Sequence, residues 1–236
     1  MEVLTAKLRA ISVSFRRILD FNYHRTYPLP PPTTIVGLLG SALGLSDREL
    51  WNEYNGLNDI SFAVLSLRKP GFAKDMWSIQ KIKNGRISER SPYFRELLFY
   101  PEYVLIFNGD SKSLECVRDA LNNPEYALSL GREDELVRVI DVQWERVEKG
   151  EPVFSGTVLP FDIREYKFSP IMEEGIFIEP PVIDKLPTSF SVDRKGIRHP
   201  KNKTAYTFVP DSLKISVNNL KGEVLSIGGR NFVWLR

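Results

Sequence analysis

The sequence predicts an α+β fold in which strands and helices follow the order β-α-β-β-α-β, with a smaller β-rich region after them. Three observations carry this prediction. Residues 4–10 alternate between apolar and polar side chains, which is the period of a strand. Two later segments place apolar residues at the i, i+3, i+4 spacing of an amphipathic helix. Beyond Gly150, short apolar runs are separated by proline and glycine turns, which is typical of β structure.

The first helix is expected directly after the prolines that end at Pro32. Thr33 or Thr34 can cap it, because a threonine hydroxyl accepts a hydrogen bond from a free backbone N–H of the first turn. Its apolar stripe consists of Ile35, Leu38, Leu39, Ala42 and Leu43. Gly37 and Gly40 are costly in a helix, so we expect a strand or a ligand backbone to approach closely at these positions.

The remaining elements of the first half follow in order. Ser46 and Glu49 form a capping-box pattern, which predicts a second short helix. Further strands are expected over residues 60–67, 103–107 and 137–147. An irregular insertion is expected over residues 68–95, and Asp110 is expected to cap a helix that ends before Pro124. This order is the split βαβ arrangement of a ferredoxin-like sandwich.

The second half of the chain has a different sequence pattern. Its short apolar runs are residues 153–159, 175–178, 204–209, 213–217 and 231–235. We therefore divide the chain into a ferredoxin-like domain, residues 1–150, and a β-rich subdomain, residues 151–236.

The formal net charge is only +2, but this sum hides a strong segregation of charge along the chain. Residues 68–95 contain eight basic and two acidic side chains, a local charge of +6. The basic ones are Arg68, Lys69, Lys74, Lys81, Lys83, Arg86, Arg90 and Arg95. Four aromatic residues are interleaved with them, namely Phe72, Trp77, Tyr93 and Phe94. Cations bind phosphates and exposed rings stack on bases, so this mixture suits a single nucleic-acid strand.

Two further segments complete the pattern of charge. Residues 131–180 carry 6 basic and 12 acidic side chains, whereas residues 181–236 carry 10 basic and 4 acidic ones. The basic residues of the last segment concentrate at Arg194, Lys195, Arg198, His199, Lys201 and Lys203. For either basic segment alone, a solvated surface arm is an equally good interpretation. Two basic segments on either side of an acidic segment favour nucleic-acid binding. The acidic segment would then contact the basic surface of a neighbouring protein.

Several function classes are excluded by composition. The chain has one cysteine and two histidines, without metal-ligand spacing, so we expect neither a metal site nor a cofactor. A single cysteine cannot form an internal disulfide, which favours a reducing cytoplasm. The longest uncharged stretch, residues 26–46, is broken by prolines and is too short in its apolar part to cross a membrane.

One loop combines residues that could act on RNA. It contains Arg16, Arg17, Tyr23, His24 and Arg25. RNA can be cut without a metal when a general base takes the 2′-hydroxyl proton and cations stabilise the developing charge. A loop that binds phosphate or packs its rings is the simpler alternative. Residues 101–107 lack the aromatic signature of an RNA-recognition motif, so we expect RNA at a helix end, at loops and at the basic arm.

Two motifs resemble those of a known family. Residues 27–44, Tyr-Pro-Leu-Pro-Pro-Pro-Thr-Thr-Ile-Val-Gly-Leu-Leu-Gly-Ser-Ala-Leu-Gly, are similar to the N-terminal signature of the Cas five family of CRISPR-associated proteins. Residues 129–133, Ser-Leu-Gly-Arg-Glu, resemble that family's second recurring motif. The likeness covers residues 1–147 in order and layout.

The resemblance implies a repeat-associated (RAMP) ferredoxin-like fold with a β-hairpin thumb between the second and third strands, where residues 68–95 lie. It also implies a subunit of the type I surveillance complex, Cascade, that caps the 5′ handle of the guide RNA. Such a subunit contacts the backbone Cas seven subunit and the large Cas eight subunit, and meets target DNA only indirectly. One branch of the family cuts precursor RNA without metal through Tyr, His and Lys residues. Tyr23 and His24 match that branch, but their loop contains no lysine.

Three hypotheses follow: a non-catalytic RNA-binding subunit first, an endoribonuclease that processes precursor guide RNA second, and a protein-interaction scaffold third. A helix that starts at Thr33 would direct free N–H groups and partial positive charge at a phosphate. Trp77 or Tyr93 would stack on a base. The residues expected to bind RNA are Arg16, Arg17, Tyr23, His24, Arg25, Thr33, Thr34, Gly37, Lys74, Trp77, Lys81, Lys83, Arg86, Arg90, Tyr93, Arg132, Arg194, Lys195 and Arg198.

Overall fold

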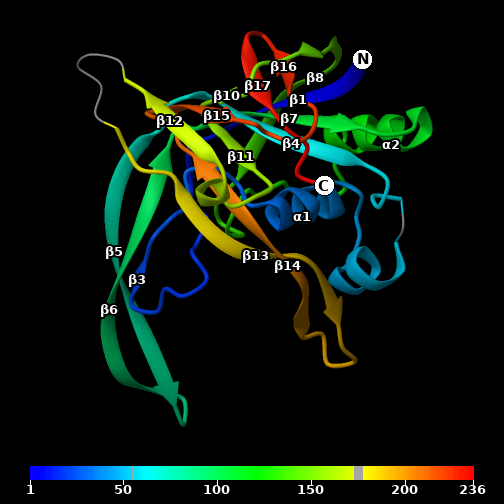
Figure 1. The fold of residues 1–236 in the computed structure, drawn as a ribbon. Coiled ribbons are helices and arrows are strands. Elements are labelled where there is room, and N and C mark those ends of the chain that lie inside the picture. Colours follow the sequence, from blue (N-terminus) through cyan, green and yellow to red (C-terminus); the bar gives the residue numbers. More distant parts are fainter. Residues whose placement is uncertain (55, 173–177) are drawn as a thin grey trace.

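The computed structural model describes residues 1–54, 56–172 and 178–236 (Figure 1). Its largest element is a seven-stranded sheet with the strand order β13-β14-β11-β4-β7-β1-β8. The helical segments are α1 (Pro32–Ala42), the π-helical turn η1 (Glu49–Glu53), α2 (Ser111–Asn122) and the 3-10 turn η2 (Ile163–Glu165). The strands are β1 (Glu2–Ala10), β2 (Ser12–Val13), β3 (Tyr23–His24), β4 (Ser61–Arg68), β5 (Gly71–Lys83), β6 (Arg86–Phe99), β7 (Glu102–Asn108), β8 (Val137–Arg146), β9 (Glu148–Lys149), β10 (Val153–Phe154), β11 (Thr157–Leu159), β12 (Lys167–Ile171), β13 (Val182–Val192), β14 (Arg198–Val209), β15 (Lys214–Asn218), β16 (Leu225–Ile227) and β17 (Arg230–Phe232).

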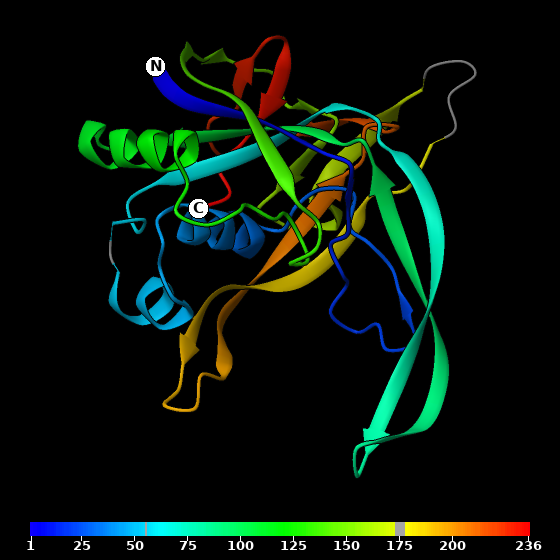
Figure 2. The ribbon, with the colours of Figure 1, turned by 180° about the vertical axis from the view of Figure 1, so that it is seen from behind.

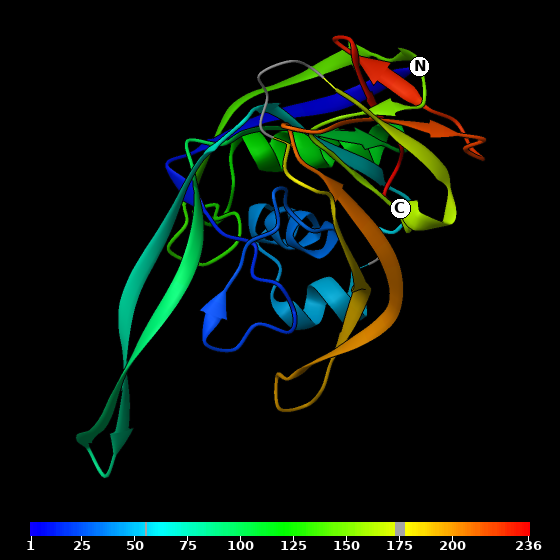
Figure 3. The same ribbon diagram turned by 60° about the vertical axis from the view of Figure 1, so that its left-hand side comes forward.

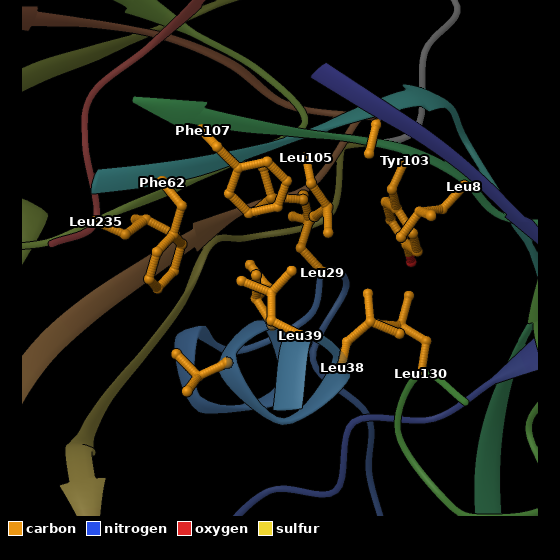
Figure 4. Close-up of a cluster of buried hydrophobic side chains, with 14 of the residues drawn as sticks. Leu8, Leu29, Leu38, Leu39, Phe62, Tyr103, Leu105, Phe107, Leu130 and Leu235 are labelled. Carbon is orange, nitrogen blue, oxygen red and sulfur yellow. The ribbon is translucent and has the colours of Figure 1, made fainter. Parts of the chain in front are cut away.

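The ferredoxin-like core is confirmed. Its four strands lie in the order β8-β1-β7-β4, and each pairs with its neighbours in the antiparallel direction. Helix α1 stands between β1 and β4 in the chain, and α2 stands between β7 and β8, which is the predicted β-α-β-β-α-β order. Both helices contribute to one buried cluster with these strands, in which Leu38 and Leu39 of α1 point toward Tyr103 and Leu105 of β7 (Figure 4).

Three strands from the second half of the chain extend this sheet beyond β4. Thr157 of β11 pairs with Leu65 of β4, and its hydroxyl donates a hydrogen bond to the carbonyl oxygen of Val64 at 2.9 Å. β14 and β13 follow beyond β11. One sheet therefore contains strands from both sides of residue 150. The division of the chain at that residue stays a prediction.

The opposite face of the sheet is covered over β4 and β7 by a small sheet with the strand order β17-β16-β9. A second small sheet, with the strand order β10-β15-β12, packs against Leu159 of β11 and Val209 of β14. Ala63 of β4 and Ile106 of β7 are fully buried in one cluster with Leu225 and Phe232 from β16 and β17. The open sheet face that an RNA-recognition motif uses is therefore covered here, which agrees with the missing aromatic signature.

The insertion at residues 68–95, predicted as irregular from its own sequence, is a long regular hairpin, and that prediction was wrong. β5 and β6 pair in the antiparallel direction along their length. Asn84 and Gly85 form the turn between them, with φ angles of 52° and 73°. Positive φ at both central positions is typical of the turn that Asn-Gly favours and that matches the twist of two strands. The hairpin implied by the family resemblance is thus present, and we call β5 and β6 the thumb.

A second long hairpin, β13 and β14, was not predicted. The basic residues that the sequence placed in a second arm, 194–203, form its turn and the start of β14. The thumb and this second hairpin project from the same end of the body in all three views (Figures 1, 2 and 3). The loop that carries β3 lies between them (Figure 3).

Helix α1 begins earlier than predicted and has a different cap. Pro31 is the N-cap residue, Pro32 is the first helical residue, and no side chain caps the helix. Proline suits this position because its missing N–H would have no partner within the first turn. The prediction that Thr33 or Thr34 caps the helix was therefore wrong.

The two glycines of α1 have different surroundings. A Cβ atom at Gly40 would lie 2.6 Å from a methyl group of Leu50, so Gly40 allows η1 to pack closely on the helix. At Gly37, nothing lies within 4 Å of the Cβ position. The close approach expected at both positions is therefore made by η1 at Gly40, whereas the space beside Gly37 is open.

The other predicted caps are present. In the capping box, the backbone N–H of Ser46 donates to Glu49 Oε2 at 2.8 Å, and the backbone N–H of Glu49 donates to Ser46 Oγ at 3.3 Å. Asp110 caps α2 by accepting from the backbone N–H of Ser113 at 3.0 Å. Most of the strand predicted at residues 175–178 lies outside the described residues. In the described part of the chain, no helix has the length and apolar character needed to cross a membrane.

Candidate nucleic-acid interface

The loop over residues 15–27, which contains the Tyr-His-Arg motif, is closed at its base. Arg16 and Thr26 form an isolated antiparallel bridge, and Arg25 Nη2 lies 2.8 Å from Oδ1 of the buried Asp20. Burial of Asp20 opposes its ionisation, but hydrogen bonds from the Arg25 side chain and backbone outweigh it, so the Asp20 pKa lies below its ordinary value. Arg25, predicted to bind RNA, is thus engaged in holding the loop closed.

The Leu-Gly-Arg motif is fastened to the start of this loop. Glu135 is buried, and it accepts hydrogen bonds from the backbone N–H of Ser14 at 2.7 Å, the Ser14 hydroxyl at 2.5 Å and the backbone N–H of Arg132 at 3.1 Å. Gly131 has a φ of 116°, and a Cβ atom there would lie 2.4 Å from the Ser14 carbonyl oxygen. Only glycine fits this position. Burial raises the pKa of Glu135, although the Ser14 hydrogen bonds act in the opposite direction.

The thumb has two chemically different faces, because neighbouring residues of a strand point to opposite sides. One face, which we call the basic face, carries Trp77, Ile79, Lys81, Lys83, Arg86, Tyr93 and Arg95, together with the acidic Asp75 and Glu89. The other, which we call the apolar face, carries Phe72, Lys74, Met76, Ile82, Ile87, Arg90, Phe94 and Glu96. The ribbon is strongly twisted, so both faces wind around it (Figures 1 and 3). β3 pairs with β6, so the consecutive residues Tyr23 and His24 also point to opposite faces.

Midway along the thumb, the basic face packs against the two motif loops. The Arg95 guanidinium lies 5.2 Å and the Arg132 guanidinium 4.8 Å from the ring centroid of Trp77. The rings of His24 and Tyr93 meet edge to face, with their centroids 5.4 Å apart. The thumb is thereby joined to the Leu-Gly-Arg motif. The Trp77 ring, which the sequence suggested as a base-stacking platform, is already engaged by two cations.

Tyr23 meets a different set of residues. Its hydroxyl donates a hydrogen bond to Glu96 Oε1 at 2.8 Å, and Lys74 Nζ lies 5.5 Å from its ring centroid. Burial and the hydrogen bond to Glu96 raise the Tyr23 pKa. Burial and the charge of Arg16 lower the His24 pKa, which favours the neutral imidazole. The thumb thus supplies Tyr23 with the lysine that its loop lacks, while His24 lies on the other face.

A cavity of about 460 Å³ lies between the start of α1, the loop that begins at Ser14 and the second hairpin. Two cations, Arg16 and Lys203, line it together with the hydroxyl-bearing Thr33 and Thr34. Its apolar walls come from Phe15, Ile18, Tyr27, Pro31, Leu186, Pro187, Phe190 and Pro200. Gly131 completes the wall on the side of the Leu-Gly-Arg motif. Cations, hydroxyl groups and a helix start therefore meet around one space.

The second hairpin is anchored beside α1. The Asn52 side chain donates to the Val192 carbonyl oxygen at 2.8 Å and accepts from the Val192 backbone N–H at 3.0 Å. Arg198 forms an ion pair with Asp47. Arg198, predicted to bind RNA, therefore ties the hairpin to the body. The other predicted cations of this hairpin, Arg194 and Lys195, are exposed in its turn.

The predicted cations at the thumb tip remain accessible. Lys83, Arg86 and Arg90 are exposed. Lys81 is also exposed but pairs with Glu89, with Nζ and Oε2 2.8 Å apart. The unbalanced positive charge of the tip thus comes from Lys83 and Arg86 on the basic face and from Arg90 on the apolar face.

The structure brings together one part of the predicted site and leaves another part outside it. Arg16, Thr33 and Thr34 share the cavity, and His24, Trp77, Tyr93 and Arg132 meet midway along the thumb. Arg17 and Arg25 line a different cavity, of about 620 Å³, on the other side of the loop. Gly37 lies outside the lining of the first cavity.

Lys203 and Glu135 belong to the candidate interface but are not among the residues that the sequence predicts to bind RNA. Lys203 was noted among basic residues but not chosen as a site, and only its position in the basic arm could have suggested it. The Ser14–Glu135 connection had no local signal, because 121 residues separate the two partners.

Comparisons with known proteins agree with this architecture. A family model described as CRISPR-associated protein (Cas_Cas5) matches residues 3–199. A solved structure described as a CRISPR RNA-guided surveillance complex is similar with a TM-score of 0.58, at 16% identity over 92% of this chain and 92% of that chain. A CRISPR protein from Archaeoglobus fulgidus is similar with a TM-score of 0.52, at 13% identity over 98% of both chains. No curated protein matches the sequence.

At such identities the two structural matches show a shared fold alone. The family match spans most of the chain and includes both motifs and the thumb. The chain belongs to the Cas five family of CRISPR-associated proteins.

Proposed function

We propose that this chain is an RNA-binding subunit of a type I CRISPR surveillance (Cascade) complex and that it caps the 5′ handle of the guide RNA in antiviral defence. The single observation that carries the proposal is the cavity beside the second hairpin, where the start of α1, Arg16, Lys203 and the Leu-Gly-Arg motif meet. Membership of the Cas five family and the surveillance-complex fold support it.

The chemistry of this region suits a single RNA strand. The start of α1 offers partial positive charge and the backbone N–H of Thr33 to a phosphate, because Pro31 and Pro32 carry no N–H and the Thr34 N–H donates to the Pro31 carbonyl oxygen at 2.9 Å. The flanking Arg16 and Lys203 add full charges. The apolar walls of the cavity can receive an unstacked base. The exposed cations of the thumb tip and of the second hairpin then extend the positive field along the strand.

The proposed protein partners are the backbone Cas seven subunit and the large Cas eight subunit. The acidic segment over residues 131–180 lies mostly outside the two hairpins and supports a contact with basic protein surfaces. Target DNA would be met only indirectly, through the guide RNA.

We further propose that the chain does not cut RNA. Tyr23 and His24 are consecutive residues of β3 and point to opposite faces of the ribbon, so they do not converge on one reacting group. In addition, the Nε2 atom of His24 lies 2.9 Å from the Phe21 carbonyl oxygen. The alternative, a metal-independent endoribonuclease, is favoured by one observation, the approach of Lys74 to Tyr23.

Incubation of the purified protein with labelled repeat RNA in EDTA separates these two functions. We expect the RNA to be bound and to stay intact. Cleavage at a single site, abolished in both His24→Ala and Tyr23→Phe, would establish the endoribonuclease instead.

The third hypothesis, a scaffold whose basic hairpins meet acidic proteins, is tested by the salt dependence of RNA binding. RNA affinity should fall with salt with a log–log slope of about −0.7 for each phosphate contacted on a single strand. A slope near zero would favour the scaffold.

A further inference from the structure

The tip of the loop that carries the Tyr-His-Arg motif has an inverted arrangement of polar and apolar residues. Asp20 is buried, whereas Ile18, Leu19 and Phe21 are 50%, 79% and 75% exposed. Ile18 and Leu19 are the two central residues of a turn, in which the backbone N–H of Asp20 donates to the Arg17 carbonyl oxygen at 3.4 Å. Such positions usually carry glycine, proline, asparagine or aspartate. Large exposed aliphatic side chains at both positions therefore indicate a contact with another molecule.

The two central residues of the turn line two different cavities. Ile18 lines the first cavity, of about 460 Å³, beside the second hairpin, and Leu19 lines the second cavity, of about 620 Å³, at the base of the thumb. The residues before them divide in the same way, because Arg16 lines the first cavity and Arg17 lines the second. The turn therefore separates the two cavities and supplies each of them with one arginine and one aliphatic side chain.

A packed partition continues below the turn. Tyr27 lines the first cavity, and its hydroxyl donates a hydrogen bond at 2.8 Å to Oδ2 of Asp184, which lines the second. The Tyr27 ring is buried and stacks on Phe208, with the ring centroids 4.4 Å apart. The turn is held on this partition at its own base, where Arg16 and Thr26 form an antiparallel bridge. The wall between the cavities thus consists of hydrogen-bonded and closely packed residues.

We propose that the Ile18–Leu19 turn is a wedge that separates two consecutive bases of the bound RNA and directs one base into each cavity, and that the base in the second cavity carries an exocyclic amino group. This inference rests on the proposed function, because it takes RNA as the ligand. An aliphatic side chain inserted between two bases replaces part of the stacking contact that they lose. Each base then meets the apolar wall of a cavity, and the arginine on the same side of the turn is available to a neighbouring phosphate.

The turn suits a nucleotide chain better than a protein segment. The loop lies between the two basic hairpins (Figure 3). A nucleotide chain alternates anionic phosphates with bases whose flat faces are apolar, and the turn presents the complementary pair twice, as Arg16 with Ile18 and as Arg17 with Leu19. An extended peptide also directs successive side chains to opposite sides. Only a nucleic acid, however, carries a negative charge at every unit.

The two cavities favour different bases. The cationic donors Arg16 and Lys203 line the first cavity, and among the described residues no acidic side chain lines it, so it suits a base with carbonyl acceptors. The carboxylates of Glu96 and Asp184 line the second cavity. A carboxylate offers about four acceptor sites, so the hydrogen bonds that these two groups already accept do not saturate them. The second cavity therefore suits a base with an exocyclic amino group, such as cytosine or adenine, and disfavours uracil.

Two adjacent 2-aminopurines in the handle RNA test the wedge. When they stack on each other, their rings couple and give a circular-dichroism signal at wavelengths where the protein does not absorb. The pair is placed at each step of the RNA in turn, and the full chain is added to saturation. We expect the coupled signal to disappear at one step. Ile18→Ser with Leu19→Ser should restore it at that step and lower RNA affinity by about tenfold.

A matched double variant is the control. Leu136→Ser with Ile140→Ser also removes two exposed aliphatic side chains, which lie at the start of β8 and within it. It should leave both the signal and the RNA affinity unchanged. A coupled signal kept at every step of the bound RNA would overturn the wedge and leave the proposed function standing, whereas a chain that binds no RNA would overturn both. A wedge variant that binds RNA normally but loses affinity for another protein subunit would show that the turn contacts protein, and would also overturn the wedge.

The base expected in the second cavity is tested at the separated step. At one of its two nucleotides, cytidine should bind about tenfold more tightly than uridine, because only cytidine offers an amino group to the carboxylates. Glu96→Gln should reduce this preference, and Lys203→Ser, on the side of the first cavity, should keep it. Equal affinity for cytidine and uridine at both nucleotides would overturn this part of the inference.

Discussion

The buried carboxylate of Glu135 accepts hydrogen bonds from both the backbone N–H and the hydroxyl of Ser14, at 2.7 Å and 2.5 Å. This contact joins the Leu-Gly-Arg motif to the end of β2, immediately before Phe15 and Arg16 enter the cavity wall. One buried carboxylate therefore holds the Leu-Gly-Arg motif against Ser14, at the start of the loop that lines the cavity.

Replacing Glu135 tests this connection. Glu135→Ala leaves the buried Ser14 donors without their acceptor, so the free energy of unfolding should fall by about 1–3 kcal/mol. Urea denaturation measures this change through the midpoint. Glu133→Ala, at an exposed position two residues away, is the control and should stay within about 0.5 kcal/mol of the unmodified chain. Equal values for the two variants would contradict a clamping role for Glu135.

Two glycine replacements should change stability in opposite directions. Gly131→Ala forces a side chain onto a backbone with positive φ and against the Ser14 carbonyl oxygen, so it should destabilise the fold by at least about 1 kcal/mol. Gly37→Ala adds a methyl group in open space on a helix and should stabilise the fold by about 0.5–1 kcal/mol. Thermal unfolding measures both. If RNA backbone approaches Gly37, as the sequence suggested, Gly37→Ala will weaken RNA binding despite the gain in stability.

Asp20 makes the free energy of unfolding depend on pH in the acidic range. Its pKa is lowered in the folded state, so its ionised form stabilises the loop. This contribution is fully present above the ordinary aspartate pKa of about 4 and is lost as the pH falls through the lower folded-state pKa. Asp20→Asn should therefore be less stable than the unmodified chain at pH 7, and the difference should shrink below about pH 4. A difference in unfolding free energy that stays constant from pH 7 to pH 3 would contradict this assignment.

Charge reversal at the thumb tip tests the basic face. Lys81, Lys83 and Arg86 changed together to Glu should weaken guide-RNA binding without unfolding the protein, and the salt slope should become less negative by about 2 units. The control reverses Lys112, Arg138 and Arg146, which are exposed on α2 and β8 and alter the net charge equally. Filter binding at several salt concentrations measures both. The same loss of affinity in both variants would indicate an effect of net charge alone, and unchanged affinity would remove the thumb from the RNA path.

Trp77 is predicted to hold the thumb in place. Trp77→Ala removes a ring that two guanidinium groups contact, each contact being worth about 0.5–2 kcal/mol. Amide hydrogen exchange in β5 and β6 should accelerate, and RNA affinity should fall. Met76→Ala, at the exposed position next to it, should leave exchange unchanged. An unchanged exchange rate together with a lower RNA affinity would instead support Trp77 as a base-stacking residue.

The core of the fold could be predicted from sequence because its signals are local. The alternation in β1, the stripes of both helices and the capping residues Ser46 and Asp110 each lie within a few positions of one another. The thumb was missed from its own sequence because apolar residues occur on both of its faces, as at Met76 and Trp77, which obscures the strand period. The Asn84–Gly85 pair was the available signal for its turn.

The candidate site was predictable in composition but not in geometry. The basic and aromatic residue types form a pattern that is visible in the sequence, yet which of them face a common space depends on long-range pairing. β3 pairs with β6 across more than 70 positions, and this pairing separates Tyr23 from His24. The second hairpin brings Lys203 to the start of α1. No local pattern encodes either arrangement.

The central claim is that guide RNA passes between the two hairpins and meets the start of α1. Crosslinking mass spectrometry with a handle RNA that carries 4-thiouridine at successive positions tests it most directly. We expect crosslinks within residues 16–34, at the Leu-Gly-Arg motif, on the basic face of the thumb and within residues 194–203. Crosslinks concentrated on α2 and the outer edge of β8, with none in those segments, would contradict it.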